Sequence, residues 1–143
     1  MDKLILSTIF CITNNYKRYV STINGVDDFA RTNGVTRMLI SFICESKEDV
    51  YQKTIEKTFG FSRSTASNII TQMENEGLVV REKVNEDQRL RKLSLTDKSI
   101  IIYNKIREEK SNYEKIITKD FSKEELNQLN YLLNKLKNAV GKE

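Results

Sequence analysis

Histidine and proline are both absent from this chain of 143 residues, and glycine occurs only five times. Without histidine, the sequence has no histidine-based catalytic triad, no histidine general base and no histidine metal ligand. It also lacks a glycine-rich phosphate loop and a clustered pair of carboxylates. We therefore expect no enzyme, no metal site and no cofactor. The lack of proline and the scarcity of glycine permit long, uninterrupted helices.

Cysteine and long apolar runs are also scarce. Cys11 and Cys44 lie inside apolar stretches without a CxxC neighbour, so we predict reduced, buried thiols in a cytosolic protein. The apolar run over residues 4–12 is too short to span a bilayer, and it lacks a basic flank and a cleavage site. We expect no secretion signal, no membrane association and a cytoplasmic location.

Hydrophobic residues make up 38% and charged residues 31% of the chain, which carries a net charge of +4. This composition is typical of a soluble, mostly helical protein with one compact domain, alone or with dimerisation arms. The small positive charge is compatible with a polyanionic partner but does not identify one.

Apolar residues recur at alternating spacings of three and four over most of the chain, a pattern that predicts amphipathic helices. The predicted helices cover residues 3–23, 35–46, 50–59, 63–76, 96–118 and 122–140. In the last one, leucines and a valine repeat as a strict heptad seam: Leu126, Leu129, Leu133, Leu136 and Val140.

Short polar residues and glycines mark the helix ends. We predict that Asp49 with Gln52, and Ser122 with Glu125, form capping boxes, because each side chain can satisfy a free amide at the other residue. The other predicted ends are the N-caps Ser62 and Thr96 and the terminating glycines Gly60 and Gly77. Between Gly77 and Thr96 the period changes to two, with Val80, Glu82 and Val84 alternating with charged neighbours before a turn at 85–87. This predicts a β-hairpin over residues 78–95.

Two short helices joined at Phe59-Gly60-Phe61-Ser62 form a helix-turn-helix candidate. On the second helix, Ala66, Ile69, Ile70 and Met73 share one face, and Ser64, Ser67, Asn68 and Thr71 share the opposite one. A solvated helix face usually carries Lys and Glu, whereas this one carries small uncharged polar residues.

Such side chains suit a DNA groove. Asn68 and Gln72 can pair bidentately with adenine, and Ser62, Ser64 and Thr65 lie at a helix N-terminus, which favours a phosphate. A plain polar surface helix without lysine is the alternative, and the helix alone does not decide between the two.

The hairpin tip adds a second candidate contact. The side chain of Arg89 can enter a narrow minor groove, and Asp87 can hold that side chain extended through a charge-assisted pair. An ordinary solvated hairpin is the alternative. Over residues 62–98 there are seven basic and six acidic residues, a balance of only +1, so the DNA-binding hypothesis depends on where the charges lie.

The successive elements SRSTAS, MENEGLVVR and DQRLRKLSLT resemble the multiple-antibiotic-resistance regulator (MarR) family over about residues 35–99. The resemblance implies a mainly α (α+β) fold: a winged helix-turn-helix of about six helices with a wing of two to three strands. It implies a symmetric homodimer built by the first and last helices. The corresponding segments are a dimerisation helix and loop at 1–34, the DNA-binding domain at 35–98 and dimerisation helices at 99–143.

Carried over by position, the resemblance implies double-stranded DNA as the partner and a role as a transcription regulator, expected to be a repressor. Side chains facing the major groove would be Ser64, Thr65, Ser67, Asn68 and Gln72, and Arg89 would enter the minor groove with Asp87 in support. Ser62, Arg63, Gln88 and Arg91 complete the predicted contact set. A small apolar effector is the family's usual switch, and no residue here identifies one.

The chain departs from the family pattern at two positions. Ser99 stands where glycine is common, and Asn68 stands where a basic residue is frequent, so the preferred base can differ. Two alternatives stay open: a winged-helix protein-interaction module, and a thiol-based redox sensor through Cys11, which has Tyr16 and Tyr19 nearby in sequence. For Cys11 we favour a structural thiol, since buried free cysteines are usually inert.

Overall fold

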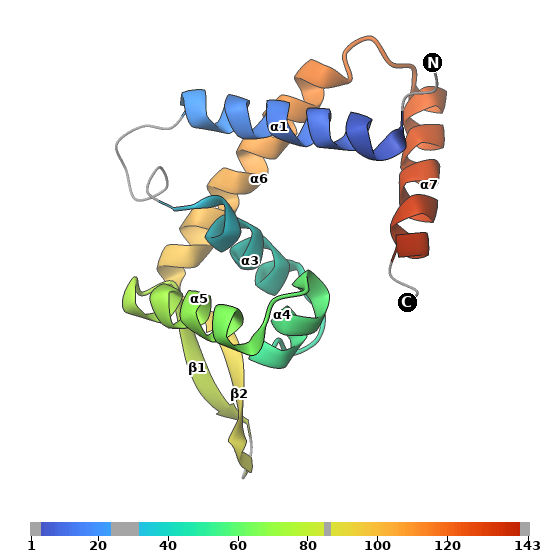
Figure 1. Cartoon of the computed structure of the whole chain (residues 1–143). Coiled ribbons are helices and arrows are strands. Elements are labelled where there is room, and N and C mark those ends of the chain that lie inside the picture. Colours follow the sequence, from blue (N-terminus) through green and yellow to red (C-terminus); the bar gives the residue numbers. More distant parts are fainter. Residues whose placement is uncertain (1–3, 24–31, 85–86, 141–143) are drawn as a thin grey trace. The chain divides into compact units, whose positions relative to one another are not determined.

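The computed structural model describes residues 4–23, 32–84 and 87–140, and of residues 23, 87 and 88 it describes the backbone only. The chain divides into two compact units, Met1–Glu108 and Glu109–Glu143. The described elements are α1 (Ile5–Ile23), α3 (Gly34–Glu45), α4 (Gln52–Phe59), α5 (Arg63–Asn75), β1 (Val79–Val84), β2 (Asp87–Leu95), α6 (Asp97–Ile117) and α7 (Lys123–Val140) (Figure 1). The predicted mainly helical fold with an antiparallel wing is confirmed. The predicted boundary at residue 98 stays a prediction.

Most predicted helix ends are present in the structure. The Ser62 hydroxyl accepts a hydrogen bond from the Thr65 amide at 3.1 Å. Ser122 and Glu125 exchange the two bonds of a capping box, at 3.1 and 2.8 Å. Gly60 and Gly77 adopt φ values of 68° and 70°, which glycine reaches without the steric cost that a Cβ imposes.

The predicted capping box at Asp49 is wrong. Helix α4 begins at Gln52, and the Tyr51 amide before it donates to Thr54 Oγ1 at 3.1 Å. The preceding backbone is extended and pairs with β2: the Leu93 amide donates to the Val50 carbonyl at 2.8 Å, and an isolated bridge joins Tyr51 and Lys92. Because Val50 and Tyr51 are extended and paired with β2, the helix starts three residues after Asp49, which is too far for Asp49 to act as its N-cap.

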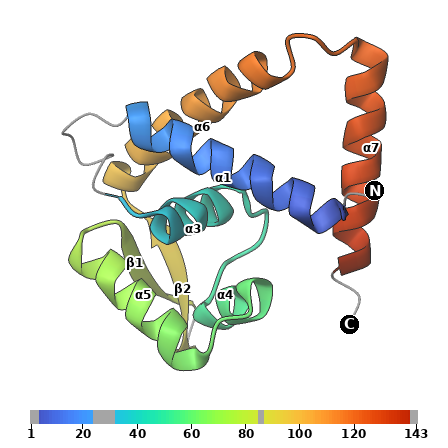
Figure 2. The ribbon, with the colours of Figure 1, turned by 45° about the horizontal axis from the view of Figure 1, so that its top comes forward.

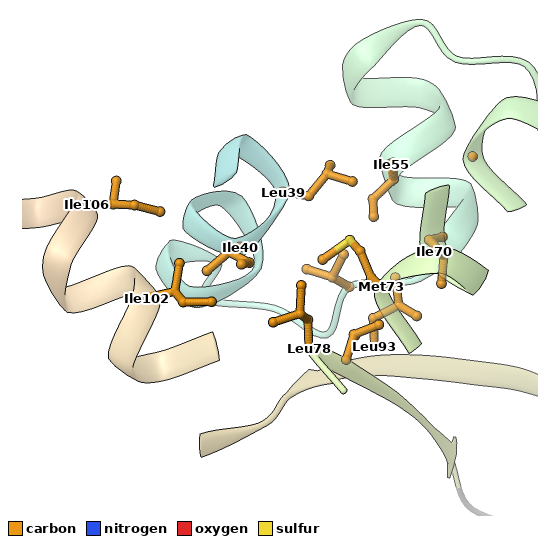
Figure 3. Close-up of a cluster of buried hydrophobic side chains, with 12 residues drawn as sticks. Leu39, Ile40, Ile55, Ile70, Met73, Leu78, Leu93, Ile102 and Ile106 are labelled. Carbon is orange, nitrogen blue, oxygen red and sulfur yellow. The ribbon is translucent and has the colours of Figure 1, made fainter. Parts of the chain in front are cut away.

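The hydrophobic core lies among α3, α4, α5, the base of the hairpin and the first half of α6 (Figure 3). Helix α3 contributes Leu39 and Ile40, and α5 contributes Ile70 and Met73. From the remaining elements come Ile55, Leu78, Leu93, Ile102 and Ile106. Because these positions repeat at helical spacing, each helix turns one apolar stripe inward.

The hairpin pairs Val79 with Leu95 and Arg81 with Leu93, and its register shifts between Lys83 and Val84. Around its base lie α3, α4 and α5 (Figure 2). Val79 is buried whereas Val80 is 43% exposed. The inward positions of β1 are therefore Val79 and Arg81, one residue out of phase with the alternation of Val80, Glu82 and Val84 noted in the sequence.

The first and last helices bury little within one chain. No described residue of α1 or α7 is buried, and the heptad residues Leu129 and Leu133 are exposed. The prediction that both thiols are buried is wrong, because Cys11 is exposed on α1 and Cys44 is only half-buried on α3. Among the described helices, none has the length and apolar character to cross a membrane.

Candidate nucleic-acid interface

The turn between α4 and α5 is held by aromatic packing. Gly60 takes the left-handed conformation, and the Phe61 amide donates to the Glu56 carbonyl at 3.2 Å. The Phe59 ring meets Phe42 of α3 edge-on, with centroids 5.1 Å apart, and stacks on Phe61 at 5.8 Å. These contacts fix where α5 leaves the turn, so its orientation follows from the core.

Helix α5 separates its two faces as predicted. Ala66, Ile70 and Met73 are buried, and Ile69 packs against the core. On the outer side Ser67 is half-buried. The other predicted contact residues of this segment are exposed: Ser62, Arg63, Ser64, Thr65, Asn68 and Gln72. Apart from the half-buried Ser67 and from Thr71, which meets Arg81 of the wing, the side chains of the outer face are exposed and available to a partner.

Three hydroxyl groups gather at the N-terminus of α5. Ser62 Oγ lies 2.8 Å from Thr65 Oγ1 and 3.2 Å from Ser64 Oγ. Gln52 of α4 donates to the Arg63 carbonyl at 3.3 Å, which ties the start of α5 to α4. The result is an ordered group of hydroxyls and amides at a helix N-terminus, an arrangement suited to a phosphate oxygen.

Farther along the same face, the two amide side chains differ. Gln72 Nε2 donates to Glu76 Oε1 at 2.9 Å, so its amide is already oriented along the helix. Asn68 makes no hydrogen bond with its side chain to any of the described residues. An unengaged amide on an exposed helix face offers both a donor and an acceptor to a base edge.

The wing carries the remaining predicted contacts. Arg89 and Arg91 lie on β2 and are exposed, and Arg89 already interacts with other groups of the chain. The side chains of Asp87 and Gln88 lie outside the described part of the structure, so the predicted pair of Asp87 with Arg89 stays a prediction.

At the base of the wing, basic residues meet carboxylates. Lys92 Nζ lies 3.5 Å from Asp49 and 3.9 Å from Glu82. Arg81 Nε lies 3.0 Å from Glu74 Oε2 of α5, and its Nη2 donates to Thr71 Oγ1 at 3.5 Å. Arg81 and Glu74 are not among the contact residues predicted from the sequence. The signal that could have found Arg81 is strand alternation, which puts it on the same side as the buried Val79.

Between α3 and α6, Tyr103 donates to Glu45 Oε1 at 3.2 Å. Burial raises the pKa of Tyr103, and Glu45 raises it further. Burial also raises the pKa of the Cys44 thiol, again with a contribution from Glu45. Both groups therefore stay protonated at neutral pH, and Cys44 has little thiolate character. The described residues include no group of three acidic or sulfur side chains able to hold a metal.

Residues 31–90 match the model of the MarR family. This segment contains α3, α4, α5, β1 and the start of β2. A search of curated proteins gave no match.

Several solved structures share the fold. An uncharacterized SlyA-like transcription regulator from Listeria monocytogenes superposes with a TM-score of 0.79 at 22% identity, over 98% of this chain and 91% of that one. A putative MarR family transcriptional regulator from the same organism, solved in complex with 26mer DNA, superposes with a TM-score of 0.78 at 23% identity, again over 98% of this chain and 91% of that one. A MarR/EmrR family transcriptional regulator from Acinetobacter sp. ADP1 superposes with a TM-score of 0.72 at 23% identity, over 96% of this chain and 95% of that one.

Proposed function

We propose that this chain, whose residues 31–90 match the model of the MarR family, is a transcription regulator that binds double-stranded DNA in a sequence-specific manner. The outer face of α5 would lie in the major groove and the tip of the wing in the adjacent minor groove. The observation that carries the proposal is the composition of that face, where small uncharged polar side chains stand exposed directly opposite the buried stripe.

The likeness to the DNA-bound Listeria regulator supports the same proposal, since that protein shares the fold over nearly the whole chain. In this chain the corresponding helix, α5, has three hydroxyl groups at its N-terminus for a phosphate and amide side chains farther along for base edges. Phosphate contacts fix the register of a protein on DNA, and base contacts supply sequence preference. Helix α5 provides both kinds of group on one face.

We propose further that the DNA-binding species is a homodimer. Each of the end helices carries exposed apolar residues, including Leu6 and Phe10 on α1 and Leu129 and Leu133 on α7. A second copy is the partner that a heptad seam suits. Twofold symmetry then predicts a pseudo-palindromic operator with half-sites about 10 base pairs apart.

The regulatory part of the proposal is repression in the cytoplasm, with release by a small ligand. A ligand that favours one spacing between the two α5 helices of the dimer would shift the dimer towards or away from its binding-competent form. It is supported by the family resemblance alone, and an effector would be sought by its effect on DNA affinity.

The test is a selection of duplexes from a random-sequence pool by the full-length protein, followed by titration of the selected duplex at several salt concentrations. We expect an inverted repeat and an affinity that falls steeply with salt, because bound phosphates release counterions. A pool that shows no enrichment, with no salt-dependent binding to any duplex, would refute the proposal. Tight capture of a protein partner in that case would favour the interaction-module alternative.

A further inference from the structure

Arg81 connects the wing to the outer side of α5. It lies on β1 opposite Leu93, on the side of the hairpin where Val79 is buried. Its guanidinium reaches two residues of α5, Glu74 at 3.0 Å and Thr71 at 3.5 Å. Thr71 and Glu74 are three residues apart and hence neighbours on the helix surface, so one planar group can touch both.

The contact is partly shielded from water. The side chains of Arg81 and Glu74 are only 30% and 32% exposed. The Nε atom is buried and has no hydrogen-bond partner among the described residues, so it holds Glu74 by charge attraction rather than by an aligned hydrogen bond. A guanidinium in this setting fixes direction better than an ammonium would, because its donors are arranged in a rigid plane.

The charge of Glu74 gives the contact a consequence for DNA binding. A carboxylate on a helix that enters a DNA groove repels the phosphates nearby. Arg81 neutralises the charge of Glu74 by direct contact with its carboxylate. Lys92 is a useful contrast, because it is also paired with carboxylates but meets Asp49 and Glu82 at the base of the hairpin and does not meet α5.

We infer that Arg81 is a positioning residue for sequence recognition: it sets the angle of α5 against the wing through Thr71 and Glu74, and it neutralises Glu74 beside the DNA. The inference rests on the proposed function and adds to it a residue outside the expected contact set. It separates two effects, because charge neutralisation governs affinity for any duplex whereas the angle governs discrimination between duplexes.

The experiment compares wild type with Arg81→Lys, Arg81→Gln, Glu74→Gln and the double variant Arg81→Gln/Glu74→Gln. Each protein is titrated with the duplex that wild type selects from a random pool and with a scrambled duplex of the same composition. The readouts are the ratio of the two affinities and the salt dependence of each. Lys92→Gln is the matched control, since it removes a paired cation that does not touch α5. Thermal unfolding checks that each variant is folded.

For Arg81→Lys, which keeps the charge, we expect wild-type affinity for the scrambled duplex but a specificity ratio lower by about fivefold, because the planar contact is lost. For Arg81→Gln we expect weaker binding to both duplexes, by about threefold or more on the scrambled one, because Glu74 is left unpaired. The double variant should regain scrambled-duplex affinity without regaining specificity, a non-additive result that identifies the two residues as partners. Lys92→Gln should leave the ratio unchanged.

Two results would overturn the inference while the proposed function stands. One is an unchanged specificity ratio in Arg81→Lys and in the double variant. The other is an equal loss of affinity in Arg81→Gln and in the double variant, together with a slope of log affinity against log salt concentration that is shallower by about one. That result is expected if Arg81 itself binds a phosphate. If wild type selects no duplex and binds none in a salt-dependent way, the proposed function fails and the inference with it.

Discussion

The segment between α3 and the middle of α6 differs sharply from the two end helices in how it uses its apolar residues. The former encloses a core of fully buried side chains such as Leu39, Ile55 and Ile70. The latter carry comparable apolar stripes, yet no described residue of α1 or α7 is buried in the single chain. Burying apolar area is the main favourable contribution to folding. We therefore expect the segment from α3 to the middle of α6 to be stable alone, and the end helices to be stabilised by the proposed dimer.

The largest effect on DNA affinity is expected from substitutions that disrupt the proposed dimer contact of the end helices. Replacing Leu129 and Leu133 of α7 with lysine puts charges into the proposed seam, where they cannot be buried without a pairing partner. We expect monomers by sedimentation equilibrium, and affinity for the selected full duplex lower by about 100-fold or more, since two linked half-site contacts become one. Glu124→Lys at the exposed start of α7 is the control. A dimer that survives the double substitution would contradict the assignment of α7.

The converse test is made in the core of the winged segment. Ile70 is 1% exposed on the inner face of α5. Ile70→Ala should lower the free energy of unfolding by about 2–5 kcal/mol, because it leaves a cavity in packed surroundings. Chemical denaturation measures the loss, and Ile101→Ala, at an exposed apolar position on α6, is the matched control. Equal losses in the two variants would show that the core is not where the structure has it.

A smaller effect is expected at the wing. Arg89→Ala should weaken binding to the selected duplex by about tenfold and make its salt dependence shallower, through loss of one cationic contact. Fluorescence anisotropy at two or more salt concentrations measures both quantities. Lys83→Ala removes an exposed cation from the other strand of the hairpin and serves as the comparison. Identical behaviour of the two variants would mean that the charge of the wing matters but the position of Arg89 does not.

No effect is expected at Cys11. It is exposed on α1 in the single chain, and the proposed dimer would be built partly by that helix. Mild peroxide should leave DNA affinity unchanged and Cys11 unmodified by mass spectrometry. Oxidation of Cys11 with loss of binding, absent from Cys11→Ser, would instead establish the redox-sensor alternative.

Features set by neighbours in the sequence could be predicted without the structure. The caps at Ser62 and Ser122, the glycine exits at Gly60 and Gly77, and the two faces of α5 each depend on residues within a turn or two, where spacing determines geometry. For the same reason the predicted contact residues of α5 are found on its exposed side.

Features that depend on distant partners could not be predicted. Asp49 was expected to cap α4, but Val50 pairs with Leu93, far along the chain, and Asp49 meets Lys92 instead. The contact of Arg81 with Glu74 likewise depends on how the hairpin packs against α5. Burial of Cys11 was inferred from apolar neighbours, but an apolar stripe indicates only that a helix has a face to cover and does not say that the same chain covers it.

The most direct test of the central claim is the base preference of Asn68→Ala, determined by selection from the same random pool as wild type. If the outer face of α5 contacts base edges, the preference should relax at one position in each half-site, symmetrically about the centre of the inverted repeat, while Thr58→Ala on α4 leaves the selected sequence unchanged. An Asn68→Ala protein that selects the wild-type sequence at every position, with undiminished discrimination, would contradict the account.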